Sequence, residues 1–305
     1  MNTNTIVKIE KWLLLGHILM LVFGLAGLLI VLPNPDLILN LSAIGKKAFA
    51  WSMAGGGAVY MILGTVAVAI FAYRTIGIWH WLTFMIPAVG ISLGSELLGT
   101  GTGFPFGHYH YLGGLGIKIA ERVPFTIPLS WFYVGFSGYI IALVGLKKAG
   151  LNKWLSEIGA IALGAIILTS WDFALDPAMS QTAVPFWIWE QPGAFFGMPY
   201  QNFAGWLATG TIFMSVATLL WKVKPLTLPE SQELGLPLAV YFSNFAFGAI
   251  ISLEAGIYLP VFLGTLLGVV PITILYFMAK IQGVENSIES LPEEDKPKLA
   301  GALRK

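Results

Sequence analysis

The sequence predicts an all-α fold: a polytopic transmembrane bundle of about eight helices, with apolar loops that cap its non-cytoplasmic side. The first supporting observation is composition. Of the 305 residues, 56% are hydrophobic and only 11% are charged, whereas about a quarter of the residues in soluble domains are charged. The second is that the apolar residues form long runs. Lipid is therefore the expected solvent for most of the surface.

Eight apolar segments of roughly 18–22 residues are each long enough to cross the hydrocarbon core of a bilayer. The last two lie close together, so a re-entrant pair is an alternative to two full crossings. Residues 1–280 are expected to form a single transmembrane domain, and the polar segment 281–305 a cytoplasmic tail that is disordered or weakly helical. The predicted spans are 12–32, 52–73, 78–98, 126–146, 155–173, 201–221, 236–254 and 257–279.

Basic residues predict the orientation of the spans. Thirteen of the 17 Lys and Arg residues fall on one side of an eight-span bundle. Cytoplasmic loops are rich in Lys and Arg, so we expect both termini in the cytoplasm. Lys8 and Lys11 precede the first span as in a signal peptide, but that apolar run is too long and no small-residue cleavage site follows it. We therefore expect the first span to be retained.

Ionisable residues in a membrane are costly, so each one is a functional candidate. With this orientation, five acidic residues fall at the non-cytoplasmic ends of spans or in the loops between them. Two histidines lie in a loop on the same side, and three polar residues open the sixth span there. Such convergence suggests one pocket. These residues are Glu96, Asp172, Asp176, Glu190, Glu254, His108, His110, Tyr200, Gln201 and Asn202.

Three apolar, loop-like stretches carry most of these residues: ELLGTGTGFPFGHYHY, WDFALDPAMSQ and WIWEQPGAFFGMPYQNFAGW. Ordinary solvated loops are more polar, so we expect these loops to fold back onto the bundle and cap an apolar cavity. Structural interpretations stay open. Glu96 could be an interfacial helix-end residue, Asp172 or Asp176 could cap the backbone before Pro177, and the Trp and Tyr residues of 187–206 could form an interfacial belt.

Several function classes are excluded or weakened. The absence of Cys excludes disulfides and thiolate sites, and a net charge of +1 argues against a nucleic-acid partner. No span interior has the Lys that a retinal protein needs, and four His are too few for a membrane di-iron oxygenase. His108 and His110 could bind a metal with Glu96, but alternation in an extended segment places both His on one side, which packing alone can explain. Acid–base chemistry by carboxyl groups, or transport, remains.

ELLGTGTGFPFGHYHY, WDFALDPAM and PYQNFAGW resemble the integral-membrane carotenoid 1,2-hydratases of the CruF type, and the similarity extends over roughly residues 50–280. The resemblance implies a hydro-lyase that adds water to the terminal double bond of an acyclic carotenoid end and forms a tertiary 1-hydroxy group. It implies γ-carotene, lycopene-type or bisanhydrobacterioruberin-type substrates and no cofactor. It further implies a bacterial inner or photosynthetic membrane, with other carotenoid-pathway membrane enzymes as candidate partners.

Residue roles follow from the chemistry of alkene hydration, which needs a strong acid, a stabilised cation and a base for the attacking water. Burial in an apolar site raises the pKa of a carboxyl group and keeps it protonated. Asp172 is the first choice for the acid, and Asp176 or Glu96 for the base, assisted by His108 or His110. No metal site is expected. The candidate substrate-binding residues are Trp171, Phe173, Trp187, Trp189, Tyr200 and Asn202.

Two rival functions remain at this point. A transporter or a lipid- or carotenoid-binding protein without catalysis would explain the bundle and the buried acids, and Asn244 is its clearest mid-span polar group. It would not explain why polar residues gather at one end only. A carotenoid hydroxylase that uses oxygen would form the same type of alcohol, but its product would gain one O rather than H2O.

Overall fold

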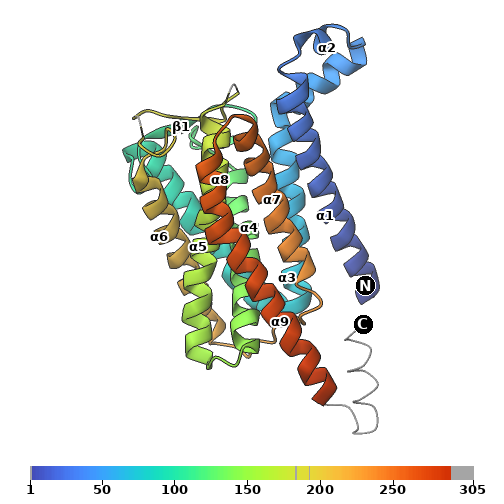
Figure 1. Ribbon diagram of the computed structural model, residues 1–305, viewed down its shortest axis with the longest axis vertical. Coiled ribbons are helices and arrows are strands. Elements are labelled where there is room, and N and C mark those ends of the chain that lie inside the picture. Colours follow the sequence, from blue (N-terminus) through green and yellow to red (C-terminus); the bar gives the residue numbers. More distant parts are fainter. Residues whose placement is uncertain (1, 183, 192, 290–305) are drawn as a thin grey trace.

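The computed structural model describes residues 2–289 except 183 and 192, and its main elements are helices that form an elongated bundle (Figure 1). Within the described residues, seven helices are long and apolar enough to cross a membrane. The all-α transmembrane fold class is therefore confirmed.

Helix α1 (Thr3–Ala26) continues into a π-helical turn, η1 (Gly27–Val31). Together they make one apolar span that starts nine residues before the predicted limit at residue 12. A short helix, α2 (Pro35–Leu39), then projects beyond the bundle (Figure 1).

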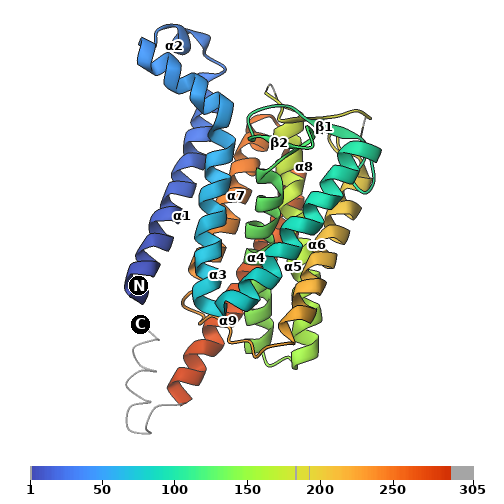
Figure 2. The ribbon, with the colours of Figure 1, turned by 180° about the vertical axis from the view of Figure 1, so that it is seen from behind.

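Helix α3 (Ala43–Thr102) contains two of the predicted spans, 52–73 and 78–98. Gly77 interrupts the helix with φ 79° and ψ 165°, a conformation that side-chain-bearing residues rarely adopt. The chain reverses there, and the two halves of α3 run in opposite directions (Figure 2). Seven apolar helices therefore provide the eight predicted crossings.

Five further helical segments complete the bundle. α7 and the helix that follows it are joined by a short turn at residues 255–257, and both are long enough to cross. Figure 1 shows them running antiparallel along the bundle, so the structure favours two full crossings over a re-entrant pair. The elements are α4 (Thr126–Lys148), α5 (Lys153–Ser180), α6 (Tyr200–Trp221), α7 (Gly235–Glu254), and the continuous α8 (Tyr258–Gly264), η2 (Thr265–Val269) and α9 (Val270–Glu289).

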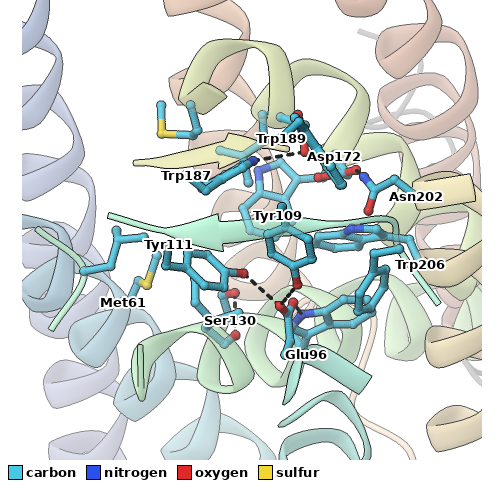
Figure 3. Close-up of a pocket in the computed structure, with 18 of the residues that line it drawn as sticks. Met61, Glu96, Tyr109, Tyr111, Ser130, Asp172, Trp187, Trp189, Asn202 and Trp206 are labelled. Carbon is cyan, nitrogen blue, oxygen red and sulfur yellow. Dashed lines mark hydrogen bonds between the residues drawn. The ribbon is translucent and has the colours of Figure 1, made fainter. Parts of the chain in front are cut away.

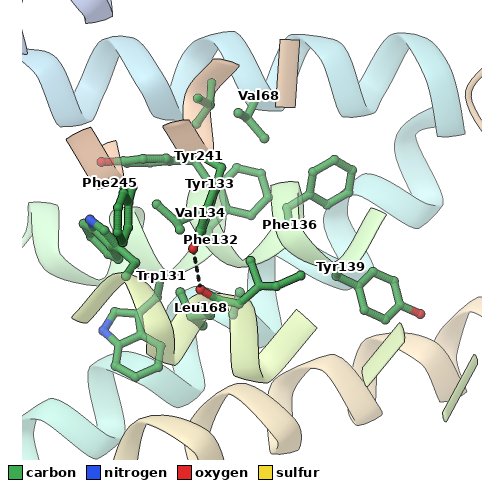
Figure 4. Close-up of a cluster of buried hydrophobic side chains, with 14 of the residues drawn as sticks. Val68, Trp131, Phe132, Tyr133, Val134, Phe136, Tyr139, Leu168, Tyr241 and Phe245 are labelled. Carbon is green, nitrogen blue, oxygen red and sulfur yellow. Dashed lines mark hydrogen bonds between the residues drawn. The ribbon is translucent and has the colours of Figure 1, made fainter. Parts of the chain in front are cut away.

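Helix α4 forms the centre of the bundle. In its most apolar stretch 89% of the residues are buried, against 11% for α1, which lies at the edge. A helix that is apolar on all sides packs on all sides, and α4 contacts α3, α5, α7 and α9. Its side chains form the core cluster in Figure 4 with neighbours from the surrounding helices: Trp131, Phe132, Tyr133, Val134, Phe136, Tyr139, Val68, Leu168, Tyr241 and Phe245.

The loops at the end away from the N-terminus carry four short strands. β1 (Tyr109–Tyr111) pairs antiparallel with β4 (Trp187–Trp189), and β2 (Lys118–Ile119) pairs with β3 (Val123–Pro124). Figures 1 and 2 show these loops covering that end of the bundle, as the apolar stretches predicted.

The N-terminus and the end of α9 lie together at the opposite, uncapped end (Figure 1). Helix α9 continues to Glu289, past the predicted domain limit at residue 280, and the rest of the predicted tail lies outside the described residues. Which end faces the cytoplasm stays a prediction from the basic residues.

Candidate active site

A cavity of about 40 Å³ lies beneath the cap, where α3, α4, α5, α6, β1 and β4 meet (Figure 3). It has room for a few water molecules. Three of the five predicted acidic residues reach it. Its walls are Tyr60, Met61, Glu96, Phe106, Tyr109, Tyr111, Leu115, Ile127, Ser130, Trp131, Trp171, Asp172, Leu175, Asp176, Met179, Trp187, Trp189, Asn202 and Trp206.

Glu96 lies in the second half of α3 and is almost fully buried. Its Oε2 accepts hydrogen bonds from the hydroxyls of Tyr109 and Tyr111, the latter at 2.9 Å, and its Oε1 accepts one from Nε1 of Trp131 at 3.2 Å. The interpretation of Glu96 as an interfacial helix-end residue is therefore wrong. Three neutral donors surround this carboxyl group and stabilise its anionic form.

The two tyrosines come from one face of β1. Successive side chains of a strand point to opposite sides, so Tyr109 and Tyr111 are buried while His110 is exposed. Burial, and then the nearby negative charge of Glu96, raise the pKa of both phenols well above the ordinary value. Both tyrosines therefore stay protonated and act as hydrogen-bond donors at physiological pH.

Asp176 on α5 is the second carboxyl group with three donors. Its Oδ1 accepts from Nε1 of Trp189 at 2.9 Å and from the hydroxyl of Ser180 at 3.0 Å. Its Oδ2 accepts from Nε1 of Trp187 at 3.2 Å. The pairing of β4 with β1 places both indoles over this carboxyl, so the cap positions Asp176 as well as Glu96.

Asp172 lies one helical turn before Asp176, on the same face of α5, and is also buried. Within the described residues its carboxyl accepts one side-chain hydrogen bond, from Nδ2 of Asn202 at 2.7 Å. Of the three carboxyl groups it has the fewest donors to stabilise an anion. It is therefore best suited to keep a proton.

None of the ion pairs found among the described residues involves these three carboxyl groups. Burying several carboxylates together without a cation is strongly unfavourable. Two carboxyl groups that share a site tend to divide into one protonated and one ionised group. The cavity can thus hold an acid and a base at the same time.

Indole rings form much of the remaining wall. Trp131 and Trp206 stack with their ring centroids 4.0 Å apart and an interplanar angle of 20°. Trp171 packs edge-on against Trp206 with the centroids 5.9 Å apart. Aromatic faces attract cations, by roughly 0.5–2 kcal/mol each. The wall can therefore stabilise a carbocation that forms beside it.

Most predicted site residues reach the cavity: Glu96, Asp172, Asp176, Trp171, Trp187, Trp189 and Asn202. Phe173 does not, because it follows Asp172 by about 100° around the helix and packs against Phe203 and Phe195 instead. Tyr200 is 64% exposed at the start of α6. Glu254 is exposed at the end of α7.

The two histidines are also outside the cavity, which corrects their predicted catalytic role. His108 is exposed, and Nδ1 of His110 donates to Glu190 at 3.1 Å on the outer surface. Alternation does place both His on one side, but that side faces outward. In the described part of the chain, no three His, Asp or Glu are grouped closely enough to hold a metal ion.

Sequence reasoning missed Tyr109, Tyr111, Trp131 and Trp206. The alternation in HYHY offered a signal for the tyrosines, since the less polar side chain of each pair is the better candidate for the buried face. Trp206 follows Asn202 by four residues, which puts both on one face of α6. Trp131 had no signal, because α4 is apolar on every side.

Comparison with known proteins then decides the family. The chain matches the carotenoid biosynthesis protein family over residues 56–271. It belongs to that family. The matched region contains all three carboxyl groups of the cavity and the strands that position Glu96 and Asp176.

The chain is also similar to a curated protein, the bisanhydrobacterioruberin hydratase of Haloarcula japonica. The two are 35% identical over 130 residues. The alignment covers 43% of this chain and 41% of the relative, so the chain spans about two fifths of the length of the relative it matches. No solved structure matches the chain.

Proposed function

We propose that this protein is a carotenoid 1,2-hydratase, which adds water to the terminal double bond of an acyclic carotenoid end and forms a tertiary 1-hydroxy group. The observation that carries the proposal is a small cavity with indole walls and three buried carboxyl groups, none of which is paired with a cation in the described part of the chain. The similarity to a bisanhydrobacterioruberin hydratase agrees with this chemistry. The proposed substrates are γ-carotene, lycopene-type or bisanhydrobacterioruberin-type chains.

The reaction starts with protonation of the alkene. Asp172 gives its proton to C2, the π electrons form the new C2–H bond, and the positive charge is left on C1, where it is tertiary. Asp172 suits this step because Asn202 is its one side-chain donor in the described structure. The resulting aspartate and the faces of Trp131, Trp171 and Trp206 would stabilise the cation.

Water then attacks C1 and loses a proton to a base. We assign the base to Asp176, whose three donors favour its anionic form. It lies one turn from Asp172, so a cavity water can return the proton to Asp172 and restore both groups. Glu96, held by its own three donors, would in its ionised form supply negative charge opposite the cation.

Product mass tests the proposal. The gene would be expressed in bacteria that accumulate lycopene or γ-carotene. The molecular mass of the extracted pigment would then be measured by mass spectrometry. A gain of one H2O per reacted end is expected. Unchanged pigment from membranes that contain the folded protein would refute the proposal, and a gain of one O alone would indicate a hydroxylase.

The contacts of Asn244, the main mid-span polar residue of the rival transport hypothesis, argue against that hypothesis. Asn244 donates to Nε2 of His17 at 2.9 Å and accepts from the hydroxyl of Tyr133 at 3.0 Å. Nδ1 of His17 donates to the carbonyl of Tyr60 at 2.7 Å. These groups satisfy one another between α1, α4 and α7, so they favour helix packing over a transport path.

For the orientation, we propose that the capped end is non-cytoplasmic, because most Lys and Arg residues in the described part of the chain lie at the other end. Reporter fusions after Lys148 and Lys224 should report cytoplasm, and one near Gln181 should not. A non-cytoplasmic signal after Lys148 would overturn this orientation.

A further inference from the structure

A second, much larger cavity of about 640 Å³ lies beside the carboxyl cavity. It is a groove between α1 and the first half of α3, with residues 113–115 and 184–186 of the cap along one side and Phe247 of α7 behind it. Helix α1 lies at the edge of the bundle (Figure 2), so a groove beside it is placed where lipid would reach it.

The lining of the groove is apolar. None of the described residues that line it is charged, and five of its side chains are aromatic: Phe23, Trp51, Tyr60, Phe186 and Phe247. The glycines of residues 55–57 leave one wall without side chains. An added Cβ at Gly55 would meet nothing within 4 Å, and one at Gly56 would meet only Ser52 Oγ at 3.4 Å. A wide, methyl-bearing hydrocarbon chain can lie against such a wall.

The groove and the carboxyl cavity share three residues, Tyr60, Leu115 and Met179. These residues therefore lie between the apolar groove and the cavity that holds the buried acids. Two cap loops hold this boundary in place. The hydroxyl of Thr126 donates to the carbonyl of Leu115 at 2.5 Å, and the amide of Phe186 donates to the carbonyl of Met179 at 2.7 Å.

We propose that the groove binds the polyene part of the substrate, and that the terminal isoprenoid unit enters the carboxyl cavity past Tyr60, Leu115 and Met179. This inference rests on the proposed function for its substrate class. The small cavity holds a few waters and cannot hold a long chain, whereas the adjoining groove has the size of a typical ligand site. A charge-free lining fits a hydrocarbon better than a phospholipid with its headgroup.

Thiol labelling tests the proposal directly, because the natural chain has no Cys. Gly56→Cys would place a single thiol in the groove, and Gly94→Cys is the matched control. Gly94 is also on α3, has nothing within 4 Å of an added Cβ, and does not line the groove. Both variants would be purified in detergent, with and without lycopene, and reacted with an apolar maleimide.

Lycopene should slow labelling of the Gly56→Cys protein about tenfold and leave Gly94→Cys unchanged. In parallel, Gly56→Phe and Gly55→Phe should lower the lycopene retained per protein about tenfold, and Gly94→Phe should not. A monodisperse elution profile confirms that each variant is folded. Cysteine substitutions are small, so the labelling result stands even if a Phe variant fails to fold.

Labelling of Gly56→Cys that does not respond to lycopene would overturn the proposal. So would protection by a phospholipid such as phosphatidylglycerol but not by lycopene, since Lys47 lies over the ring of Trp51 at 5.5 Å and could attract a headgroup. Both assays measure lycopene binding and do not require that the protein hydrate lycopene. A protein that binds lycopene in the groove but does not hydrate it would refute the proposed function alone.

Discussion

The two ends of the bundle both bury carboxyl groups, but among the described residues only those at the uncapped end are paired with a cation. There, Arg74 donates to the two carboxyl oxygens of Glu10 at 2.7 and 3.0 Å and also bonds Glu233. This cluster ties α1 and the segment before α7 to the end of the first half of α3. At the capped end, the acids receive hydrogen bonds from phenol, indole, hydroxyl and amide groups instead.

The difference indicates what each end can do. A carboxylate held by a guanidinium stays ionised, because its partner is charged at every relevant pH. Such a pair holds helices together but is a poor proton donor. Carboxyl groups surrounded by neutral donors can exist in either state, and their protonation depends on the number of donors and on each other's charge. The capped end is therefore suited to proton transfer and the uncapped end to structure.

The largest expected effect comes from Asp172→Asn. The amide keeps the size of the side chain but cannot supply an acidic proton, so hydration should fall by about 10²–10⁴-fold. The variant should still be folded in the membrane. Product yield per folded protein is the measurement. Near-normal yield would show that Asp172 is not the acid and would make Glu96 the leading candidate.

Asp176→Asn and Glu96→Gln should lower the hydration rate by different amounts, and the difference tests which residue is the base. Loss of the base at Asp176 should lower the rate about 10²-fold, whereas loss of the negative charge at Glu96 should lower it about tenfold, equivalent to about 1.4 kcal/mol. Single-turnover rates of the two variants would be compared. A larger loss in Glu96→Gln would reverse the two roles.

Tyr111→Phe removes one donor from Glu96 without emptying the space beside it. A hydrogen bond to a charged group contributes about 1.5–3 kcal/mol. Two other donors to Glu96 remain, so the rate loss should not exceed the roughly tenfold loss expected for Glu96→Gln. His110→Ala is the matched control on the adjacent, outward position of β1 and should behave like the natural protein. Equal losses in the two variants would mean that the strand is disturbed rather than the carboxyl group.

Arg74→Met should affect stability and leave the chemistry unchanged. Glu10 is buried and Arg74 is partly buried. Removing the cation from a buried pair costs about 3–5 kcal/mol, which is an upper limit here, so the thermal midpoint should drop. Hydration per folded molecule should stay the same. A changed rate in the folded fraction would break the proposed division of roles between the two ends.

The helices could be predicted well because bilayer thickness fixes the length of an apolar run. The predicted span 201–221 corresponds to α6, Tyr200–Trp221. Topology also predicted that Glu96, Asp172 and Asp176 would meet, since an even count of crossings brings their helix ends to one side. The Arg74–Glu10–Glu233 cluster was not predicted, because its members are far apart in sequence and nothing local marks them as partners.

Side-chain direction in the cap was the main error. His108 or His110 was expected to assist the base, but the pairing of β1 with β4 decides which face of HYHY is buried. That pairing joins segments almost 80 residues apart, and no local pattern reveals it. The large groove beside α1 was also beyond sequence reasoning, because a cavity depends on how helices pack and not on which residues they contain.

The source of the new hydroxyl oxygen tests the central claim most directly. Membranes that contain the protein would be incubated with lycopene in ¹⁸O-labelled water without O2, and the product analysed by mass spectrometry. Acid–base hydration predicts a 1-hydroxy product that carries the label from water and forms at the same rate without oxygen. A product that forms only with O2 and takes its label from O2 would contradict the account.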